Sequence, residues 1–382
     1  MTWTELDPGR RPLVETNFFD LPEEALPFKL RSGETLPEVR LAYELYGEIN
    51  DNADNVVLLF HALTGSQHVA GFNPAVKGVE LWVEENQTGW WEGFVGSGLA
   101  VDTDHLAVLC VNYLGGCYGT TGPVSIDPRT GRPYGPDYPQ VHLSDIVRSQ
   151  LPLLDHLGIE KVRAVGGASV GALLSLSMAA RYPDRVDTVI ALAGGLAGTT
   201  LQRMHNFEQK LAILNDPNFN GGNYYNGLSP EAGLALARII SHKSFVSIDA
   251  IRDRARNELI DHPYVTDPVE SYFWHQGQKL VIRFDANSYL RIIDAWSTYN
   301  LLDDTGAASY VEALQACEGQ RWHVLTIDSD VCFYPEEQER LVKALLEAGV
   351  DVTWVQVSSP KGHDAFLTEP RLFDAVLRKA LA

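Results

Sequence analysis

A single stretch decides the fold of this chain, Ala164-Val165-Gly166-Gly167-Ala168-Ser169-Val170-Gly171-Ala172-Leu173-Leu174. An apolar run enters it from Val162, and a run rich in Ala, Leu and Ser leaves it toward Tyr182, so a strand is predicted to meet a helix at Ser169. Residues 167–171 fit the pattern Gly-x-Ser-x-Gly, a turn so tight that its flanking positions must be nearly free of side chains. The turn lifts the serine hydroxyl to the end of a sheet and aims the N–H groups of the following helix at it. This pattern favours an acyl-transfer nucleophile. A turn that merely packs closely can have the same sequence pattern, so the residues elsewhere in the chain must decide whether Ser169 is a nucleophile.

Composition limits the possible partners. The chain has 382 residues and a hydrophobic content of 45%, enough for one large α/β domain with an insertion or for two domains. The formal net charge of −20 disfavours nucleic acids and anionic membranes, because both are polyanions. The four cysteines have neither Cys-x-x-Cys spacing nor the density of a disulfide scaffold, which fits a reducing compartment, and no metal is expected.

The beginning of the chain carries no targeting signal that we recognise. Its first thirty residues hold several charged side chains and no continuous apolar stretch, so we expect neither a signal peptide nor a membrane span there. No later segment is apolar for long enough either. We therefore expect a cytoplasmic protein.

A buried strand is predicted well before the serine. Val56 to Phe60 is apolar at every position, as a strand covered on both faces must be. It runs into residues 61–65, a loop at the carboxyl end of the strand, where α/β sheets place their chemistry. The backbone N–H groups of Leu63 and Val170 are candidate oxyanion donors. His61 is a candidate base, although a histidine that ends a buried strand is more often structural.

The pattern of strands and helices changes after the strand that ends at Ala193. Residues 194–319 contain helical segments rich in polar and aromatic residues, which predicts a helical cap over the site. We therefore predict a core formed by residues 1–193 and 320–382, with a mostly parallel sheet and helices on both faces. The helices expected in the cap are Leu201–Leu214, Pro230–Ile240, Asp249–Leu259 and Ser288–Tyr299.

The last two predicted strands are each followed by a residue that suits catalysis. His323 to Ile327 ends in Asp328-Ser329-Asp330, and Val352 to Val357 leads to His363. The order Ser, Asp, His along the chain is that of the α/β-hydrolase fold. Ser169, an aspartate and His363 can then act as nucleophile, orienting acid and general base. The spacing alone leaves both aspartates open as the acid.

Several long stretches resemble the homoserine O-acetyltransferase family, the α/β-hydrolase-fold acyltransferases of methionine biosynthesis. The resemblance extends from residue 36 to the end of the chain. It is carried by His61-Ala62-Leu63-Thr64-Gly65, Gly89-Trp90-Trp91, residues 112–123, 125–128, 154–159, 215–222 and 283–290, and Gly362-His363-Asp364-Ala365-Phe366-Leu367.

The resemblance implies a catalytic triad of Ser169, Asp330 and His363, which decides between the two aspartates. It places the oxyanion donors on the backbones of Leu63 and Val170. It also implies a ping-pong reaction, in which acetyl-CoA acylates the serine and the hydroxyl of L-homoserine then takes the acetyl group. Acetyl-CoA is a co-substrate in this reaction, and no permanently bound cofactor is expected.

The resemblance also implies how the substrate amino acid is held. Asp364, directly after the triad histidine, corresponds to the carboxylate at which the family holds the amino acid. We place the family's carboxylate-binding arginine at Lys210, where lysine keeps the charge and loses the bidentate fork. Ala168 and Ala172 stand where the family's serine turn has glycines, and both are small enough for the turn. Dimerisation through the cap is a further implication.

Other activities remain open on the sequence. Succinyl-CoA as donor or L-serine as acceptor needs the same triad, because the choice depends on cap residues that line the acyl pocket. A serine hydrolase also needs this triad and lets water remove the acyl group. A binding protein without catalysis is the remaining class, and an intact triad argues against it.

Overall fold

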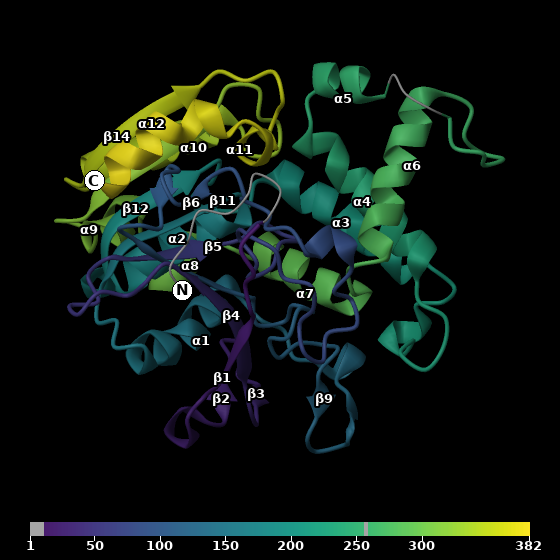
Figure 1. The fold of residues 1–382 in the computed structure, drawn as a ribbon. Coiled ribbons are helices and arrows are strands. Elements are labelled where there is room, and N and C mark those ends of the chain that lie inside the picture. The colour runs from purple at the N-terminus through teal and green to yellow at the C-terminus, as the bar shows by residue number, and fades with distance from the viewer. Residues whose placement is uncertain (1–10, 256–258) are drawn as a thin grey trace.

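The computed structural model describes residues 11–255 and 259–382. An eight-stranded sheet with helices on both faces forms the core (Figure 1), as predicted. In spatial order the strands are β1 (Asn17–Asp20), β4 (Arg40–Tyr46), β8 (Ala107–Val111), β5 (Val56–Phe60), β11 (Val162–Ala168), β12 (Val186–Leu192), β13 (Arg321–Ile327) and β14 (Asp351–Val357). The six strands from β8 to β14 in this order are parallel to one another. At the other edge β4 is antiparallel to β8, and β1 is antiparallel to β4.

Both faces of the sheet are buried because residues along the central strands alternate between two hydrophobic clusters. In β5, Val56, Leu58 and Phe60 face one cluster, and Val57 and Leu59 face the other. The first cluster is completed by α1 (Leu143–His156), α2 (Val170–Arg181) and α10 (Pro335–Glu347), and the second by α12 (Pro370–Leu381).

Three short strand pairs lie outside the main sheet. They carry none of the predicted site residues. The pairs are β2 (Phe28–Lys29) with β3 (Thr35–Leu36), β6 (Val95–Gly96) with β7 (Val101–Asp102), and β9 (Ile126–Asp127) with β10 (Arg132–Pro133).

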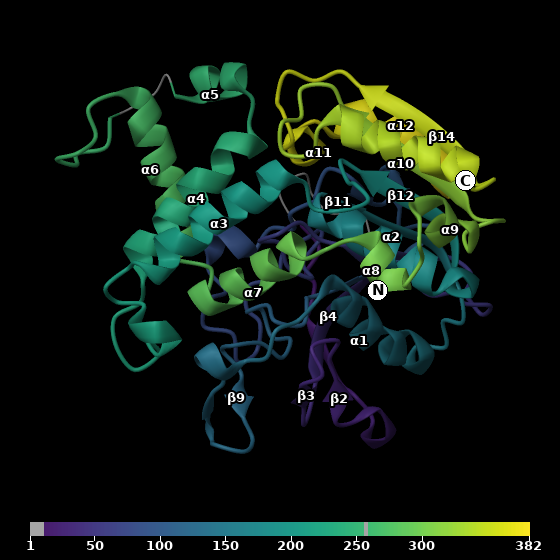
Figure 2. The same ribbon diagram turned by 180° about the vertical axis from the view of Figure 1, so that it is seen from behind.

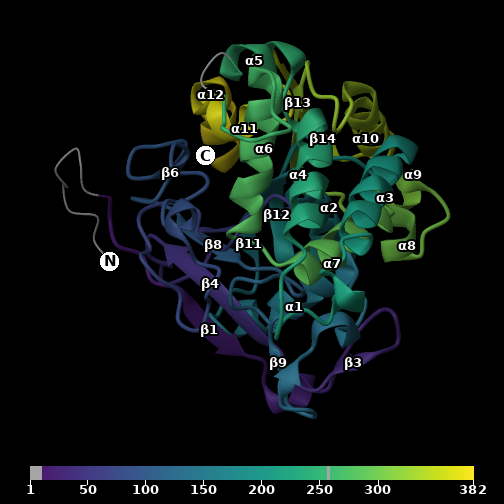
Figure 3. The same cartoon turned by 90° about the vertical axis from the view of Figure 1, so that its right-hand side faces the viewer.

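The chain between β12 and β13 is helical wherever a regular element is described. Only the first four of its helices, α3 to α6, stand over the carboxyl ends of the strands as a cap (Figure 3). Seen from behind, α7 leads from this cap toward α8 and α9 beside α2 (Figure 2), and Ser177 of α2 donates a hydrogen bond to Asp304 of α8 at 2.7 Å. The helices are α3 (Thr200–Leu214), α4 (Glu231–Phe245), α5 (Ile248–Arg254), α6 (Pro268–Val281), α7 (Ala286–Ser297), α8 (Leu301–Thr305) and α9 (Tyr310–Gln315).

Some expectations for this region need correction. Helix α6 was not predicted, and the glycine in its interior weakens the helical pattern. The helix expected from Asp249 to Leu259 ends at Arg254 as α5, and residues 256–258 lie outside the described residues. Part of the expectation for the amino-terminal segment falls on residues 1–10, which also lie outside them. No helix within residues 11–255 and 259–382 has the length and apolarity to cross a bilayer.

Candidate active site

The turn at Ser169 has the strained geometry that the sequence pattern predicts. Ser169 lies between β11 and α2 with φ at +61°, a conformation that non-glycine residues rarely adopt. A Cβ on Gly167 would lie 2.5 Å from the backbone of Gly171, and one on Gly171 would lie 2.2 Å from the carbonyl oxygen of Phe60. Both glycines are therefore required for β5 to pack against the turn. This close packing brings the loop after β5 next to the serine.

The outer alanine of the turn is accommodated by a glycine opposite it. A Cβ on Gly194, just after β12, would lie only 2.6 Å from the Cβ of Ala172. The methyl group of Ala172 therefore occupies space that the bare Gly194 leaves open. Ala168 is buried in the second hydrophobic cluster. The turn thus keeps its shape with alanine at both positions.

Asp330, and not Asp328, contacts the histidine. Nδ1 of His363 lies 2.7 Å from Oδ2 of Asp330, and both side chains are buried. The other oxygen of Asp330 accepts hydrogen bonds from the N–H groups of Cys332 and Phe333 at 2.8 and 2.9 Å. Asp328 instead accepts a hydrogen bond from the N–H of Ser359 at 3.0 Å and so supports the loop after β14.

The environment of His363 favours a charged imidazole. Burial lowers the pKa of His363, but the charge of Asp330, the hydrogen bond to it and the charge of Asp364 outweigh burial and raise the pKa. The ring stacks on Phe333 at a centroid distance of 5.4 Å, which fixes its plane. Its Nε2 is buried and has no hydrogen-bond partner among the described residues. That atom remains available for a proton from the serine.

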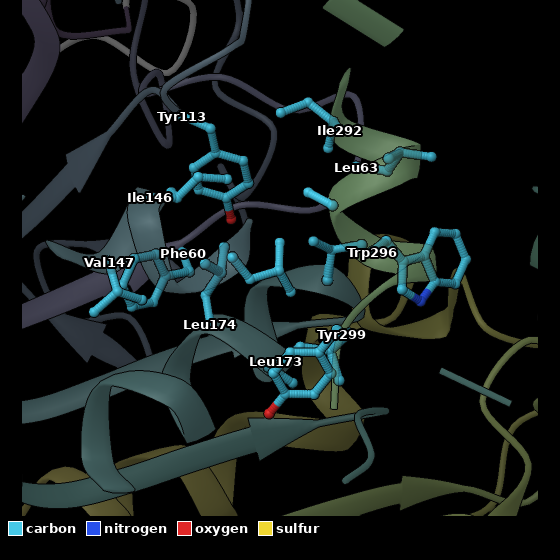
Figure 4. Close-up of a cluster of buried hydrophobic side chains, with 14 of the residues drawn as sticks. Phe60, Leu63, Tyr113, Ile146, Val147, Leu173, Leu174, Ile292, Trp296 and Tyr299 are labelled. Carbon is cyan, nitrogen blue, oxygen red and sulfur yellow. The ribbon is translucent and has the colours of Figure 1, made fainter. Parts of the chain in front are cut away.

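The turn after β5 holds the first expected oxyanion donor, Leu63. The N–H of Gly65 closes this turn by donating to the carbonyl of Ala62 at 2.9 Å. The side chain of Leu63 is buried in the first hydrophobic cluster, and Figure 4 draws it in that cluster with Ile292 and Trp296 of α7. The second expected donor, Val170, is the first residue of α2, directly after the serine. Both expected donors thus lie on segments that pack against the serine turn.

The contacts of His61 are those of a structural residue. Its ring stacks on Tyr113 at a centroid distance of 3.5 Å, and its Nδ1 lies 2.8 Å from the carbonyl oxygen of Ala62. Burial lowers the pKa of His61 to about 3, so the imidazole is neutral. Its contacts hold the shape of the turn that follows it.

One cavity contains the serine, the histidine and several charges. Its volume is about 480 Å³, and it lies between the carboxyl ends of the strands and the cap. The core contributes Ser169, His363 and the turn after β5, and the cap contributes cationic side chains. The charged residues in its lining, apart from the histidines, are Glu85, Arg238, Lys279, Arg283 and Asp364.

Arg238 and Asp364 place opposite charges in this cavity. Arg238 lies on α4 with its guanidinium 5.4 Å from the ring centroid of Phe245, and the Phe245 carbonyl accepts a hydrogen bond from the Asp364 N–H at 2.9 Å. Burial and the charge of Arg283 lower the pKa of Arg238. Burial raises the pKa of Asp364, while the charge of Arg238 opposes this effect. The two groups therefore interact, and both face the cavity.

The structure does not support Lys210 as the residue that binds the substrate carboxylate. Its Nζ lies 2.9 and 3.2 Å from the two carboxylate oxygens of Asp294 on α7, and Lys210 does not line the cavity. Arg238 is a cap cation that does line the cavity, and the sequence analysis missed it. A signal for it exists: Arg238 lies four residues after the buried Leu234 and three before the buried Ser241. An arginine on the buried side of a helix usually has a specific partner.

Comparisons with known proteins identify the family and the fold. A family model described as alpha/beta hydrolase fold matches residues 55–370. A homoserine O-acetyltransferase from Solidesulfovibrio magneticus is 41% identical over 363 residues, which covers 93% of this chain and 89% of that protein. This degree of identity over nearly the whole of both chains is far more specific than a shared fold.

Two solved structures resemble the fold closely. The crystal structure of homoserine O-acetyltransferase from Bacillus anthracis matches with a TM-score of 0.86 and 24% identity, over 97% of this chain and 98% of that one. The crystal structure of esterase E22 matches with a TM-score of 0.85 and 24% identity, over 97% of this chain and all of that one. The fold is thus shared by a transferase and an esterase, and the sequence identity decides between the families. This chain belongs to the homoserine O-acetyltransferase family.

Proposed function

We propose that this chain transfers an acetyl group from acetyl-CoA to the side-chain hydroxyl of L-homoserine through an acyl-serine intermediate. The observation that carries the proposal is the cavity in which Ser169 and His363 lie together with Arg238 and Asp364. The first two residues suit acyl transfer. The last two offer one positive and one negative group, which complement the carboxylate and ammonium of a free amino acid.

In the first half-reaction His363 acts as base and then as acid. Its Nε2 takes the proton of the Ser169 hydroxyl as the oxygen attacks the thioester carbonyl, and Asp330 stabilises the imidazolium. The N–H groups of Leu63 and Val170 stabilise the negative oxygen of the tetrahedral intermediate. When the carbon–sulfur bond breaks, the proton passes to the leaving thiolate, and the acetyl group stays on the serine as an ester.

In the second half-reaction the amino acid replaces the thiol. Arg238 binds its carboxylate as a bidentate fork, and Asp364 binds its ammonium. The homoserine hydroxyl loses its proton to His363 as it attacks the acyl carbon, and Ser169 recovers a proton when the ester bond breaks. Attack requires the hydroxyl within about 3–3.5 Å of that carbon, so the two charged contacts act by orientation.

An acceptor screen tests the proposal. Purified protein is incubated with acetyl-CoA or succinyl-CoA and with L-homoserine, L-serine or no acceptor, and free thiol release is followed. We expect sustained turnover with acetyl-CoA and homoserine, and a single burst without acceptor. Faster sustained turnover with succinyl-CoA would show that succinyl-CoA is the donor. Faster sustained turnover with L-serine would show that serine is the acceptor.

A serine hydrolase is the second candidate, favoured by the fold match to esterase E22. Water would then attack the acyl-serine directly, and the Arg238–Asp364 pair would have no role. The same screen separates the two, because a hydrolase releases thiol continuously without acceptor and yields acetate. If homoserine leaves the rate of thiol release unchanged and no O-acetyl product forms, the hydrolase assignment stands.

We also propose that two copies of the chain associate through α3. Four large apolar side chains are exposed on this helix at spacings of three, four and three residues, which places them along one face. Such a seam matches a second copy of itself in an antiparallel helix pair. These side chains are Met204, Phe207, Leu211 and Leu214.

Oligomeric state tests this association. Sedimentation of the wild-type protein at micromolar concentration should give twice the chain mass, and Phe207→Glu should give the chain mass without loss of fold. Leu372→Glu, at an exposed apolar side chain of α12, serves as the control and should leave the dimer intact. A wild-type monomer would contradict the proposal.

We infer a cytoplasmic location as well. Its support is that Cys110, Cys117, Cys317 and Cys332 are all buried and free. A thiol reagent added to the denatured, unreduced protein should titrate four thiols for each chain. Fewer would indicate a disulfide and an oxidising compartment.

A further inference from the structure

An arginine of the cap is hydrogen-bonded to the turn after β5, which carries the expected oxyanion donor. Arg283 lies two residues after the end of α6, where the chain leaves the cap. Its Nη1 donates to the carbonyl oxygen of Thr64 at 2.9 Å, and its Nη2 lies 3.2 Å from the hydroxyl oxygen of Thr64. Two N–H groups of one planar guanidinium thus bind two oxygens of one residue. This fork fixes the orientation of Thr64 as well as its position.

The arginine itself is held in place. Nη1 of Arg283 also donates to the hydroxyl of Tyr118 at 3.2 Å, and that hydroxyl donates to the backbone carbonyl of Arg283 at 2.6 Å. Tyr118 is buried and packs edge-on against Phe284 at a centroid distance of 5.6 Å. Backbone and side chain of the arginine are therefore both tied to a rigid ring of the core.

Thr64 matters because the residue before it is the candidate oxyanion donor. The carbonyl of Thr64 shares a peptide unit with the N–H of Gly65, and the N–H of Leu63 shares one with the carbonyl of Ala62. The hydrogen bond from the Gly65 N–H to the Ala62 carbonyl joins these two units within the turn 62–65. Rotation of the 64–65 unit would break this hydrogen bond and release the 62–63 unit, so that the Leu63 N–H could turn away from the site above Ser169. An oxyanion donor acts only when it lies about 2.7–3.1 Å from the position of the developing charge. A small displacement of Thr64 is therefore sufficient to weaken catalysis.

We propose that Arg283 is a positioning residue for serine acylation: it holds the Thr64 carbonyl and hydroxyl so that the Leu63 N–H faces the oxyanion. Because Arg283 belongs to the segment by which the cap returns to the core, the geometry of the oxyanion site depends on a docked cap. This role rests on the proposed acyl-serine mechanism, but not on the identity of the acceptor.

A different role for Arg283 makes a different prediction. The side chain also lines the cavity, so it could bind a phosphate of the acyl donor or the carboxylate of an acceptor. In that case a small, uncharged ester would acylate the serine normally when Arg283 is changed. As a positioning residue, Arg283 should affect the uncharged ester and acetyl-CoA alike.

The experiment measures the burst of serine acylation with 4-nitrophenyl acetate and with acetyl-CoA in the wild type and in Arg283→Lys. Lysine keeps the charge and loses the fork. We expect the acylation rate constant to fall about tenfold to a hundredfold for both donors, since loss of an oxyanion donor itself costs about 10²–10³-fold. The dissociation constant of L-homoserine should stay within about twofold of the wild-type value, because binding of the amino acid does not use the oxyanion site.

A matched control is Arg291→Lys on α7. Arg291 also joins this returning segment to the core, through a hydrogen bond from Nη2 to the carbonyl of Pro136 at 2.9 Å, but it does not line the cavity. Its acylation rate should stay within about twofold of wild type even if its melting temperature falls as far as that of Arg283→Lys. Equal losses of acylation in both variants would show a general effect of cap attachment and would overturn the specific role.

A second variant keeps the proposal testable if Arg283→Lys folds poorly. Thr64→Val removes one of the two acceptors and leaves the carbonyl, so acylation should fall severalfold for both donors. The double variant should then lose less than the product of the two single losses, because both changes break the same contact. If the losses of acylation rate in the two single variants multiply in the double variant, the positioning role is overturned. A change confined to the KM for acetyl-CoA would also overturn it. A wild-type protein without any burst would instead overturn the acyl-serine mechanism.

Discussion

The core and the cap of this molecule hold their functional groups in different ways. In the core, Ser169, Asp330 and His363 follow strands β11, β13 and β14, whose register with their neighbours is set by backbone hydrogen bonds along the sheet. In the cap, Arg238 reaches the cavity from the side of a helix that packs on other helices. The position of a core residue thus follows from sheet register, and that of a cap residue from which helix face is turned inward.

Few backbone contacts join the two regions at the site. The Ser247 N–H donates to the Lys361 carbonyl at 3.2 Å, and a Cβ on Gly362 would lie 2.6 Å from the Ser247 nitrogen. These contacts hold the cap against the loop that carries the triad histidine. In the proposed mechanism, the core performs the bond chemistry and the cap selects and orients the second substrate. Four predictions test this division of roles.

The largest effect is expected in the core, at the nucleophile. Ser169→Ala should lower turnover at least about 10⁴-fold, because the residual activity comes from binding and the oxyanion site alone. Incubation of the wild type with acetyl-CoA and no acceptor should add one acetyl mass to the peptide that contains Ser169. The mass spectrum of the variant should lack this adduct. Undiminished turnover would contradict the mechanism.

The next effect distinguishes the two aspartates of the core. Asp330→Asn should lower kcat by about 10³–10⁴-fold, because an amide no longer stabilises the imidazolium or selects the correct tautomer. Asp328→Asn should lower it less than about tenfold, since Asp328 supports a loop and does not touch the ring. Steady-state kinetics of both variants with the same donor provide the measurement. The reverse ranking would place the acid at Asp328.

The third effect should appear in the cap and only in the second half-reaction. Arg238→Lys should lower the acceptor kcat/KM about tenfold through loss of the bidentate fork, and Arg238→Ala about a hundredfold or more. Acylation by acetyl-CoA should remain within about threefold of wild type in both. The comparison variant is Lys210→Ala, which should leave acceptor kinetics within about twofold because its ammonium is paired with Asp294. A larger loss at Lys210 than at Arg238 would restore the original assignment.

The smallest effect is a shift in pH dependence. The base must be neutral to accept the serine proton, and the net influence of its surroundings raises the pKa of His363 above 6.5. The acylation rate should therefore fall as the pH decreases through a midpoint above 6.5. Asp330→Asn should move this midpoint to lower pH, because the negative charge that raises the pKa is lost. Asp364→Asn should move it in the same direction by less. A midpoint that stays in place in both variants would contradict this electrostatic account.

Much of the core was predictable from the sequence because its signals are local. The pattern around Ser169 implies the tight turn, and the apolar run Val56 to Phe60 implies a strand covered on both faces. Residues after parallel strands must meet at one edge of the sheet, so the order Ser, Asp, His already predicts a shared site. The choice between Asp328 and Asp330 was not local, because it depends on which carboxylate points at a ring 33 residues further along the chain.

What the sequence by itself determined is therefore the sheet, the turn at Ser169 and the set of candidate residues at its edge. The tertiary structure decided how the cap meets that edge. Lys210 and Arg238 are both cations on cap helices, and only helix packing turns Arg238 into the cavity and leaves Lys210 paired with Asp294. The contact of Arg283 with Thr64 joins residues 219 positions apart. Periodicity along one helix cannot specify its partner, because the face that is buried depends on elements that lie elsewhere in the chain.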